Sequence, residues 1–429
     1  MEADLRKKMK IITILFSIFL LLITDSAYAA NLPTVGYYGS MLGIILVGTV
    51  CFLYRILPFL NKKTNPLSFA VVLLLCEWVF IFSYFQGAGI GPSTKYIFIL
   101  TIAYCIALTV DFNKLMYNVV NVLFVLAAVA SAMWIIVFLF PGAYDALPQM
   151  VVVRNGQNAI YRTIGLANMF CPDYERMPRL YSVFWEPGVA QAYFNIAIIL
   201  SFKLIKGRQK ILYISVFLIA VTLTLSTTGY IVSATILLYI LLSRKNEEVS
   251  ESKVISGLKI GILIGMVVLL LILPAITSTD VYISVFDKLS DGTENQSVES
   301  RLGSITGSFE VLKDNFLLGV GLNQSMAAVW DTGLRINLTN TVMDYFVSFG
   351  IIIGGLFIAC WASFIRSLSE SVLELLTIVI TFVLIFSGEN FIQSLFFNVL
   401  MMYGLTSLID RSDFVLEKDN EETDEEIES

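Results

Sequence analysis

The sequence predicts an all-α polytopic membrane protein with about 12 transmembrane helices, and three observations indicate this fold class. Of its 429 residues, 57% are hydrophobic and only 14% are charged, whereas a soluble domain has about 45–50% apolar and about 25% charged residues. The apolar residues form runs long enough to cross a bilayer. The Lys and Arg residues alternate between successive connecting loops. A water-soluble enzyme is therefore excluded.

Two residue types limit the chemistry that the chain can perform. It contains no histidine, which excludes Ser-His-Asp triads, zinc sites built on His, and His general bases. Its 5 cysteines show no C-x-x-C spacing, and most lie in apolar runs, where a free Cys behaves as a small hydrophobic residue. The sequence therefore predicts no disulfide framework.

The apolar runs define the expected membrane spans. The stretch 211–243 is compatible with one long tilted helix, but its polar centre at 226–229 favours two short antiparallel helices. With that division, the expected spans are residues 11–28, 38–55, 67–86, 95–110, 115–140, 188–203, 211–225, 228–243, 260–276, 341–363, 371–387 and 389–409.

The distribution of basic residues orients these spans. With the N-terminus in the cytoplasm, most of the 28 Lys and Arg residues fall in cytoplasmic loops, as the positive-inside rule requires. Both termini are then cytoplasmic, and the acidic end of the chain is expected to be solvated and disordered. Residues 1–29 also resemble a cleavable signal peptide, because a basic start and an apolar run precede Ala27-Tyr28-Ala29. Cleavage stays open at this point.

This topology divides the chain into membrane segments and two long external loops. Loops longer than about 12–15 residues are usually functional or disordered, and neither of these has a disordered composition. The expected regions are membrane helices at 1–140, a first external loop at 141–187, membrane helices at 188–276, a second external loop at 277–340, membrane helices at 341–409 and a cytoplasmic tail at 410–429.

Both external loops contain a pattern of regular structure. In the first, Asn155 and Gly156 lie between β-branched runs, which predicts a hairpin with Arg154 and Arg162 beside its turn. In the second, apolar residues recur at helical spacing over 298–312, which predicts an amphipathic helix in the outer membrane interface or over a cavity. Its other face carries Glu299, Arg301, Ser304, Ser308 and Lys313.

Arginines and carboxylates at the external surface are the candidate functional residues. The guanidinium group offers a fork of donors that suits phosphate oxygens, and external arginines run against the orientation bias of membrane proteins. A basic external mouth above a membrane cavity fits a lipid-linked pyrophosphate. The arginines concerned are Arg154, Arg162, Arg176, Arg179 and Arg301.

Four carboxylates are candidates, and two of them have alternative interpretations. Glu186 precedes Pro187 and a helix start, so it either caps that helix or serves as a general base at the membrane boundary. Asp344 and Glu389 are expected at the same depth. Glu77 lies in mid-span, where an ionisable side chain indicates either a functional role or a structural pair with Arg.

The order of these motifs resembles a known family. The segment from Arg179 to Gly188, with Phe184-Trp-Glu-Pro-Gly, resembles the Arg…Phe-x-Glu-Pro-Gly segment of bacterial polysaccharide polymerases. Residues 226–229 stand where these polymerases and the O-antigen ligases have a Ser-rich break. Ser300-Arg301 and the glycines of 313–321 are similar to the Ser-Arg…Asn-Pro-x-x-Gly-x-Gly segment of the O-antigen ligase and polymerase superfamily, with Phe316 in place of Pro.

The resemblance implies an activity. Such polymerases transfer a growing glycan from undecaprenyl pyrophosphate to a hydroxyl of the next lipid-linked repeat unit, on the outer side of the bacterial cytoplasmic membrane. The ligases use an external histidine, so its absence favours the polymerase branch. The implied roles are pyrophosphate binding by Arg179 and Arg301, general base catalysis or orientation of the acceptor by Glu186, and substrate binding by Arg154, Arg162, Arg176, Asp344 and Glu389.

The resemblance also implies partners and leaves rivals. We expect lipid-linked glycans as substrates, a chain-length regulator and a flippase as partners, and neither cofactor, metal nor nucleic acid. A flippase for the same lipids, an O-antigen-type ligase and a non-enzymatic scaffold are the competing functions. A flippase needs polar residues through the depth of the membrane, whereas Glu77 is nearly alone there.

Overall fold

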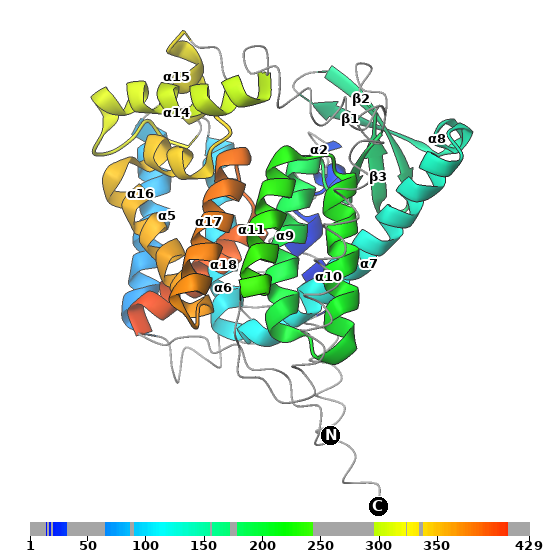
Figure 1. Ribbon diagram of the computed structural model, residues 1–429. Helices are drawn as coiled ribbons and strands as arrows, with labels where there is room; N and C mark the ends of the chain where they lie inside the picture. Colours follow the sequence, from blue (N-terminus) through cyan, green and yellow to red (C-terminus); the bar gives the residue numbers. More distant parts are fainter. Residues whose placement is uncertain are drawn as a thin grey trace, which may run out of the picture.

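The computed structural model describes much of the chain as helices with one small sheet. The described residues are 14, 17, 18, 20–31, 65–85, 90–154, 157–171, 178–242, 296–322, 324–333 and 338–410. The expected spans 38–55 and 260–276, the start of the second external loop and almost all of the C-terminal tail lie outside them. The helices of the bundle stand side by side, and the sheet lies at one end (Figure 1).

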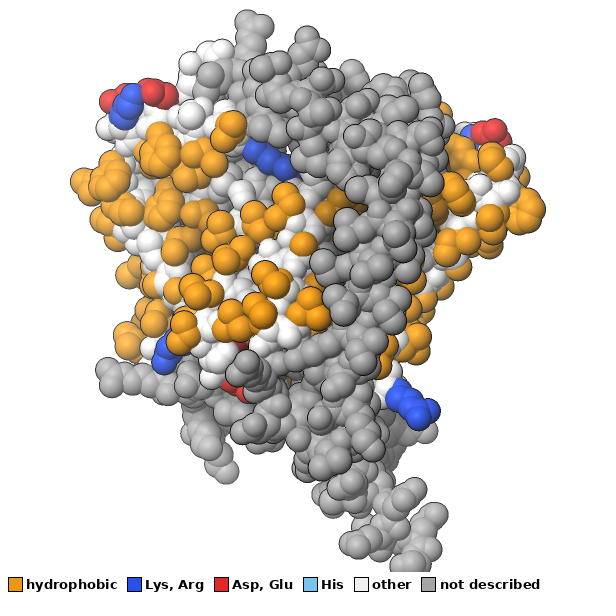
Figure 2. Space-filling model, in the orientation of Figure 1, with side chains coloured by type: hydrophobic (Ala, Val, Ile, Leu, Met, Phe, Trp, Pro, Cys, Tyr) orange, Lys and Arg blue, Asp and Glu red, His pale blue; other side chains and the backbone are white. Residues whose placement is uncertain are grey.

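Most of the expected spans within the described residues appear as bundle helices. Two of these helices are long and apolar enough to cross a membrane, α7 (Phe112–Leu139) and α16 (Thr341–Leu368). Apolar side chains cover the flank of the bundle, and charged side chains gather at its two ends (Figure 2). The other apolar helices are shorter: α5 (Pro66–Phe85), α6 (Ile90–Thr109), α9 (Pro187–Leu204), α17 (Val372–Gly388) and α18 (Leu395–Asp410).

The long apolar stretch 211–243 forms two helices, as its polar centre predicts. Three residues separate the end of α10 (Gly207–Leu223) from the start of α11 (Thr227–Leu242). Leu225 in the break has a positive φ of 52°, a backbone conformation that L residues other than Gly, Asn and Asp seldom adopt. The two helices therefore turn back on each other, and the N-terminus of α11 lies at the sheet end of the bundle.

The first external loop folds as a four-stranded antiparallel sheet, which corrects the all-α expectation for this region. Arg154 pairs with Gln157 across the predicted Asn-Gly turn, so the hairpin is confirmed. Arg162 does not lie beside this turn as expected, because it pairs with Gln149 at the other end of the hairpin. Two further strands, which the sequence did not reveal, extend it in the order β1-β2-β3-β4. Strand β4 leads directly into α9. The strands are β1 (Gln149–Arg154), β2 (Gln157–Ile164), β3 (Ala167–Phe170) and β4 (Arg179–Ser182), and the short α8 (Gly142–Ala146) precedes them.

The amphipathic helix of the second loop is confirmed as α14 (Gln296–Asn315), which lies across the sheet end of the bundle with α15 (Ser325–Asp331) above it (Figure 1). Its small residues face the protein, since Ser304 and Ser308 are 0% exposed. Its apolar stripe faces away, with Leu302 60% and Phe309 58% exposed. This orientation is that of a helix whose apolar face is open to lipid.

A turn of glycines fixes α14 to the bundle. Helix α16 is kinked at Gly350, which has a φ of 67°. The freed backbone around the kink pairs with the turn after α14: the Ile351 N–H donates to Phe316 O at 2.9 Å and the Val320 N–H to Val347 O at 2.8 Å. A Cβ atom at Gly350 would lie 2.5 Å from the Leu318 nitrogen, so only glycine fits.

The N-terminal segment packs into the same end. Tyr193 and Ser394 donate hydrogen bonds of 2.5 Å to the buried carboxylate of Asp25. The Ala27 N–H donates to Val183 O at 2.9 Å, at the start of α2 (Ala27–Asn31). These contacts make residues 24–27 part of the bundle, a role that their local sequence did not indicate.

Candidate active site

The ends of three helices meet beneath α14 at the sheet end. A Cβ atom at Gly388, the last residue of α17, would lie 3.5 Å from the Thr228 methyl carbon and 4.0 Å from Nη2 of Arg301. The next residue, Glu389, packs its side chain against Gly188 near the start of α9. Because consecutive Cα atoms are about 3.8 Å apart, these contacts bring residues from α9, α11, α14 and α17 into one site.

Arg301 is the cation of this site. It is half-buried, and no hydrogen bond or ion pair joins it to another of the described residues. Its Nη2 and Thr228, the second residue of α11, both lie within 4.0 Å of the Cβ position of Gly388, so the guanidinium group is close to a helix N-terminus whose dipole attracts anions. An unpaired cation and a helix N-terminus together form a place for a phosphate group.

Thr228 adds a hydroxyl to the same place. The residue is 7% exposed, and its hydroxyl makes no hydrogen bond within the described part of the chain. The oxygen lies 3.7 Å from the Cβ position of Gly388, which is 4.0 Å from Nη2 of Arg301. Sequence reasoning assigned no role to Thr228, although the polar pair at the start of an apolar helix is a signal that could have indicated one.

Glu186 occupies the N-cap position of α9 without capping it. Its backbone is extended, with φ −148° and ψ 147°, but its side chain makes no capping hydrogen bond to the helix. Pro187 is the first helical residue, which its fixed φ favours. The helix-cap interpretation is therefore not supported by a hydrogen bond, and the general-base role of Glu186 stays a prediction.

Arg179 supports the break between α10 and α11. Its Nε donates to Thr224 O at 3.2 Å and its Nη2 to Leu225 O at 3.0 Å. These carbonyls stand at the end of α10, where backbone oxygens lack helical partners and the dipole is negative. Arg179 therefore holds the turn that presents Thr228.

Arg162 lies on β2 and contacts α8, which stands on the side of the sheet away from α14 (Figure 1). Its Nη2 forms an ion pair with Asp145 at 3.3 Å, and its Nη1 donates to Leu147 O at 3.2 Å. The Cζ atom of the guanidinium group lies 5.3 Å from the centre of the Tyr144 ring. Burial raises the pKa of the Tyr144 hydroxyl. The side chain of Arg154 and all of Arg176 lie outside the described residues.

Asp344 and Glu389 differ in what they contact. Both carboxylate oxygens of the buried Asp344 accept hydrogen bonds, from Ser348 Oγ and from Asn390 Nδ2, each at 2.6 Å. Asp344 therefore ties α16 to the loop after α17. Glu389 belongs to that loop, and its side chain reaches α9.

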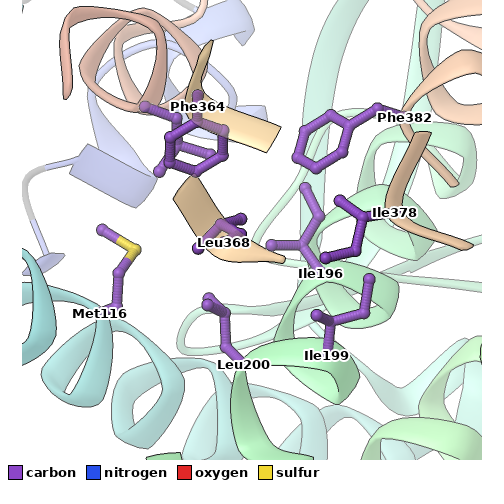
Figure 3. A pocket seen from close by; sticks show the side chains of 9 residues that line it. Met116, Ile196, Ile199, Leu200, Phe364, Leu368, Ile378 and Phe382 are labelled. Carbon is purple, nitrogen blue, oxygen red and sulfur yellow. The ribbon is translucent and has the colours of Figure 1, made fainter. Parts of the chain in front are cut away.

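A pocket inside the bundle has no polar lining. Figure 3 shows its side chains pointing toward one another from neighbouring helices, with carbon and one sulfur as their only atoms. Such a void fits apolar packing rather than a charged glycolipid headgroup. Its lining is Met116, Ile196, Ile199, Leu200, Phe364, Leu368, Ile378, Phe382 and Leu400.

The mid-span carboxylate Glu77 does not join the site. It lies on the exposed face of α5, beside the exposed Leu73 and Leu74. Neither an ion pair nor a hydrogen bond links its side chain to the rest of the described chain. The pairing with Arg that its sequence position left open is therefore not seen among these residues.

These features define a helical membrane protein with an anion-binding site at one end of its bundle. A family model described as O-antigen ligase matches residues 212–359, which include Thr228 and Arg301. This part of the chain is similar to that family, and the match supports membership of the O-antigen ligase and polymerase superfamily, whose proteins are bacterial inner-membrane enzymes of glycosyltransferase type acting on lipid-linked glycans. No curated protein matches the chain.

Proposed function

We propose that this protein is a polysaccharide polymerase, which transfers a growing glycan from undecaprenyl pyrophosphate to a hydroxyl of the next lipid-linked repeat unit. The observation that carries the proposal is the half-buried Arg301 at the N-terminus of α11, without an ion-pair partner among the described residues. A pyrophosphate group would supply the negative charge that pairs with Arg301.

The donor half of the reaction needs charge stabilisation. The bond between the anomeric carbon and the pyrophosphate oxygen breaks, and undecaprenyl pyrophosphate leaves with the bonding electrons. Donors fixed at the place where negative charge develops lower the barrier. Arg301, the Thr228 hydroxyl and the first N–H groups of α11 supply such donors, while Arg179 holds the break that positions them.

The acceptor half needs a base. As the acceptor oxygen forms its bond to the anomeric carbon, its proton passes to the carboxylate of Glu186, which makes no capping bond to its own helix. Attack from the face opposite the leaving group inverts the anomeric centre. The reaction so written requires neither histidine nor metal.

Two further points follow from the same proposal. A ligase of this superfamily is expected to use an external histidine, and this chain has none, so the polymerase is favoured. The basic residues orient the sheet end outward, so the termini are cytoplasmic and the site faces away from the cytoplasm. A chain-length regulator and a flippase are the proposed partners.

The test is a reconstitution. The purified protein in proteoliposomes receives a repeat unit linked to undecaprenyl pyrophosphate, and the products are separated by size. The proposal predicts a ladder of lipid-linked oligomers and released undecaprenyl pyrophosphate, lost in the Glu186→Gln variant. Transfer only to an added second acceptor would identify a ligase, and movement of the lipid without a new glycosidic bond would identify a flippase.

A further inference from the structure

One face of the sheet is covered by α7 over half of its width. Residues opposite each other in an antiparallel pair lie on the same face, as do alternate residues along a strand. Arg162 of β2 is opposite Met169 of β3, which is opposite Leu180 of β4. Met169 and Leu180 are 0% exposed and belong to the apolar core that contains α7. Helix α7, which is long and apolar enough to cross a membrane, contacts β3 and β4 and covers this half of the face.

The β1–β2 half of the same face is exposed and apolar. Val151 of β1 lies directly opposite Ile160 of β2, and Ile164 shares the face because it lies four residues further along β2. Val151 is 48% exposed, and the two isoleucines are each 47% exposed. These three side chains, the hairpin face, form an apolar surface of the kind that marks a contact with a membrane or a protein.

The hairpin face adjoins the exposed apolar surface at the end of α7. Arg162 lies within the face and forms its ion pair with Asp145 of α8, and α8 follows directly after α7 in the chain. The last turn of α7 is itself exposed, with Phe138 54% and Leu139 62% accessible. Lipid surrounds the exposed flank of a helix that crosses a membrane, so the surface beside the hairpin face is a lipid contact.

We propose that the hairpin face rests on the lipid leaflet at the sheet end of the bundle, so that the partner of this surface is the phospholipid itself. Strand β1 is an edge strand, and open sheet edges do not occur within the hydrocarbon region. The hairpin therefore lies at the membrane interface and not deeper. Helix α14, with its exposed apolar stripe, lies at the same end of the bundle (Figure 1).

The lipid contact gives the sheet a second attachment besides the bundle. At the other side of the sheet, Arg179 of β4 donates to the carbonyls of Thr224 and Leu225 in the break before α11. The sheet thus connects the membrane surface with the turn that presents Thr228. This contact with lipid does not depend on the proposed reaction, because it concerns the position of the hairpin in the bilayer.

Depth-dependent fluorescence quenching tests the proposal in proteoliposomes. The Ile160→Cys variant, in a background without the native cysteines, is labelled with nitrobenzoxadiazole. It is placed in phosphatidylcholine vesicles that carry a doxyl quencher either near the headgroup or near the end of the acyl chain. We expect both lipids to quench the label, the shallow quencher more strongly than the deep one.

Two exposed positions are the matched controls. Ile136→Cys, on the 52% exposed side of α7, reports a lipid contact, and Asp331→Cys, at the exposed end of α15, reports water. Emission at Ile160→Cys like that of the Asp331→Cys control would overturn the proposal. Blue-shifted emission that neither lipid quenches would overturn it as well, because a protein partner or a second copy would then cover the hairpin face.

A second measurement uses the wild-type protein, so it does not depend on the folding of a labelled variant. The protein is reconstituted with a phospholipid that carries a diazirine near its headgroup, irradiated, and digested with trypsin, which cleaves after Arg154 and Arg162. The proposal predicts lipid adducts on the peptide 155–162, which contains Ile160. Adducts on α7 with none on this peptide would overturn it.

Discussion

The guanidinium groups of three arginines in the two long loops differ in what they contact. Arg162 pairs with Asp145 near α8, and Arg179 donates to the carbonyls that end α10. Arg301 has no such partner among the described residues and lies at the start of α11. Two of these three arginines therefore stabilise the fold, and the third is open to a ligand.

Arg301→Ala should therefore remove activity and spare the fold. We expect turnover to fall by about a hundredfold to a thousandfold, the usual loss when one donor to a developing negative charge is removed. Arg162→Ala is the control, because Arg162 contacts Asp145, Leu147 and Tyr144 near α8 and none of the site residues. Turnover of both variants in proteoliposomes checks this expectation, and equal losses would contradict it.

Arg179→Lys should lower stability as well as turnover. A lysine is a point charge and cannot donate to Thr224 O and Leu225 O in the geometry of the guanidinium fork. Leaving one of these buried carbonyls without a donor costs about 1–3 kcal/mol. The thermal midpoint in detergent should fall with the activity. An unchanged midpoint would show that the two hydrogen bonds do not hold the break.

At the scale of elements, backbone contacts between helix ends place the site residues. Helix α14 carries Arg301 to the bundle because its small residues pack inward and because the turn after it pairs with the kink of α16. The N-terminal segment is held by side chains instead, through hydrogen bonds from Tyr193 and Ser394 to Asp25.

Gly350→Ala should release α14 without unfolding the bundle. The positive φ costs a non-glycine residue about 1–2 kcal/mol, and the added methyl group would press on the backbone of Leu317 and Leu318. We expect faster proteolysis of α14 and loss of turnover. Gly355→Ala in the same helix is the control, because a Cβ atom there meets nothing within 4 Å. Unaltered protease resistance of α14 would show that the kink does not dock it.

The N-terminal segment should be retained in the mature protein. Cleavage after Ala29 would remove Asp25 and the Ala27 N–H, and with them the partners of Tyr193, Ser394 and Val183. Intact-mass measurement of the purified protein checks this. A mass that begins at Ala30 would contradict it and would support the signal-peptide alternative.

At the scale of the whole molecule, local patterns predicted the helices, and long-range contacts determined the site. The span expected at 371–387 appears as Val372–Gly388, because an apolar run and its polar ends are local signals. Strand β4 pairs with β3 across a connection that carries no hairpin signal, so it was missed. Two contacts could not be predicted from the sequence, because their partners are far apart in the chain. They are the hydrogen bonds from Arg179 to the backbone carbonyls that end α10, and the packing of Glu389 against Gly188.

The central claim is that the sheet end of the bundle joins lipid-linked repeat units on the outer side of the membrane. The most direct measurement is the lipid-linked glycan profile of a deletion strain beside the same strain expressing Arg301→Ala. The account predicts that single repeat units accumulate on the outer leaflet in both strains, with normal polymer restored by the wild-type gene. Single units trapped on the inner leaflet, or polymer of normal length with Arg301→Ala, would contradict it.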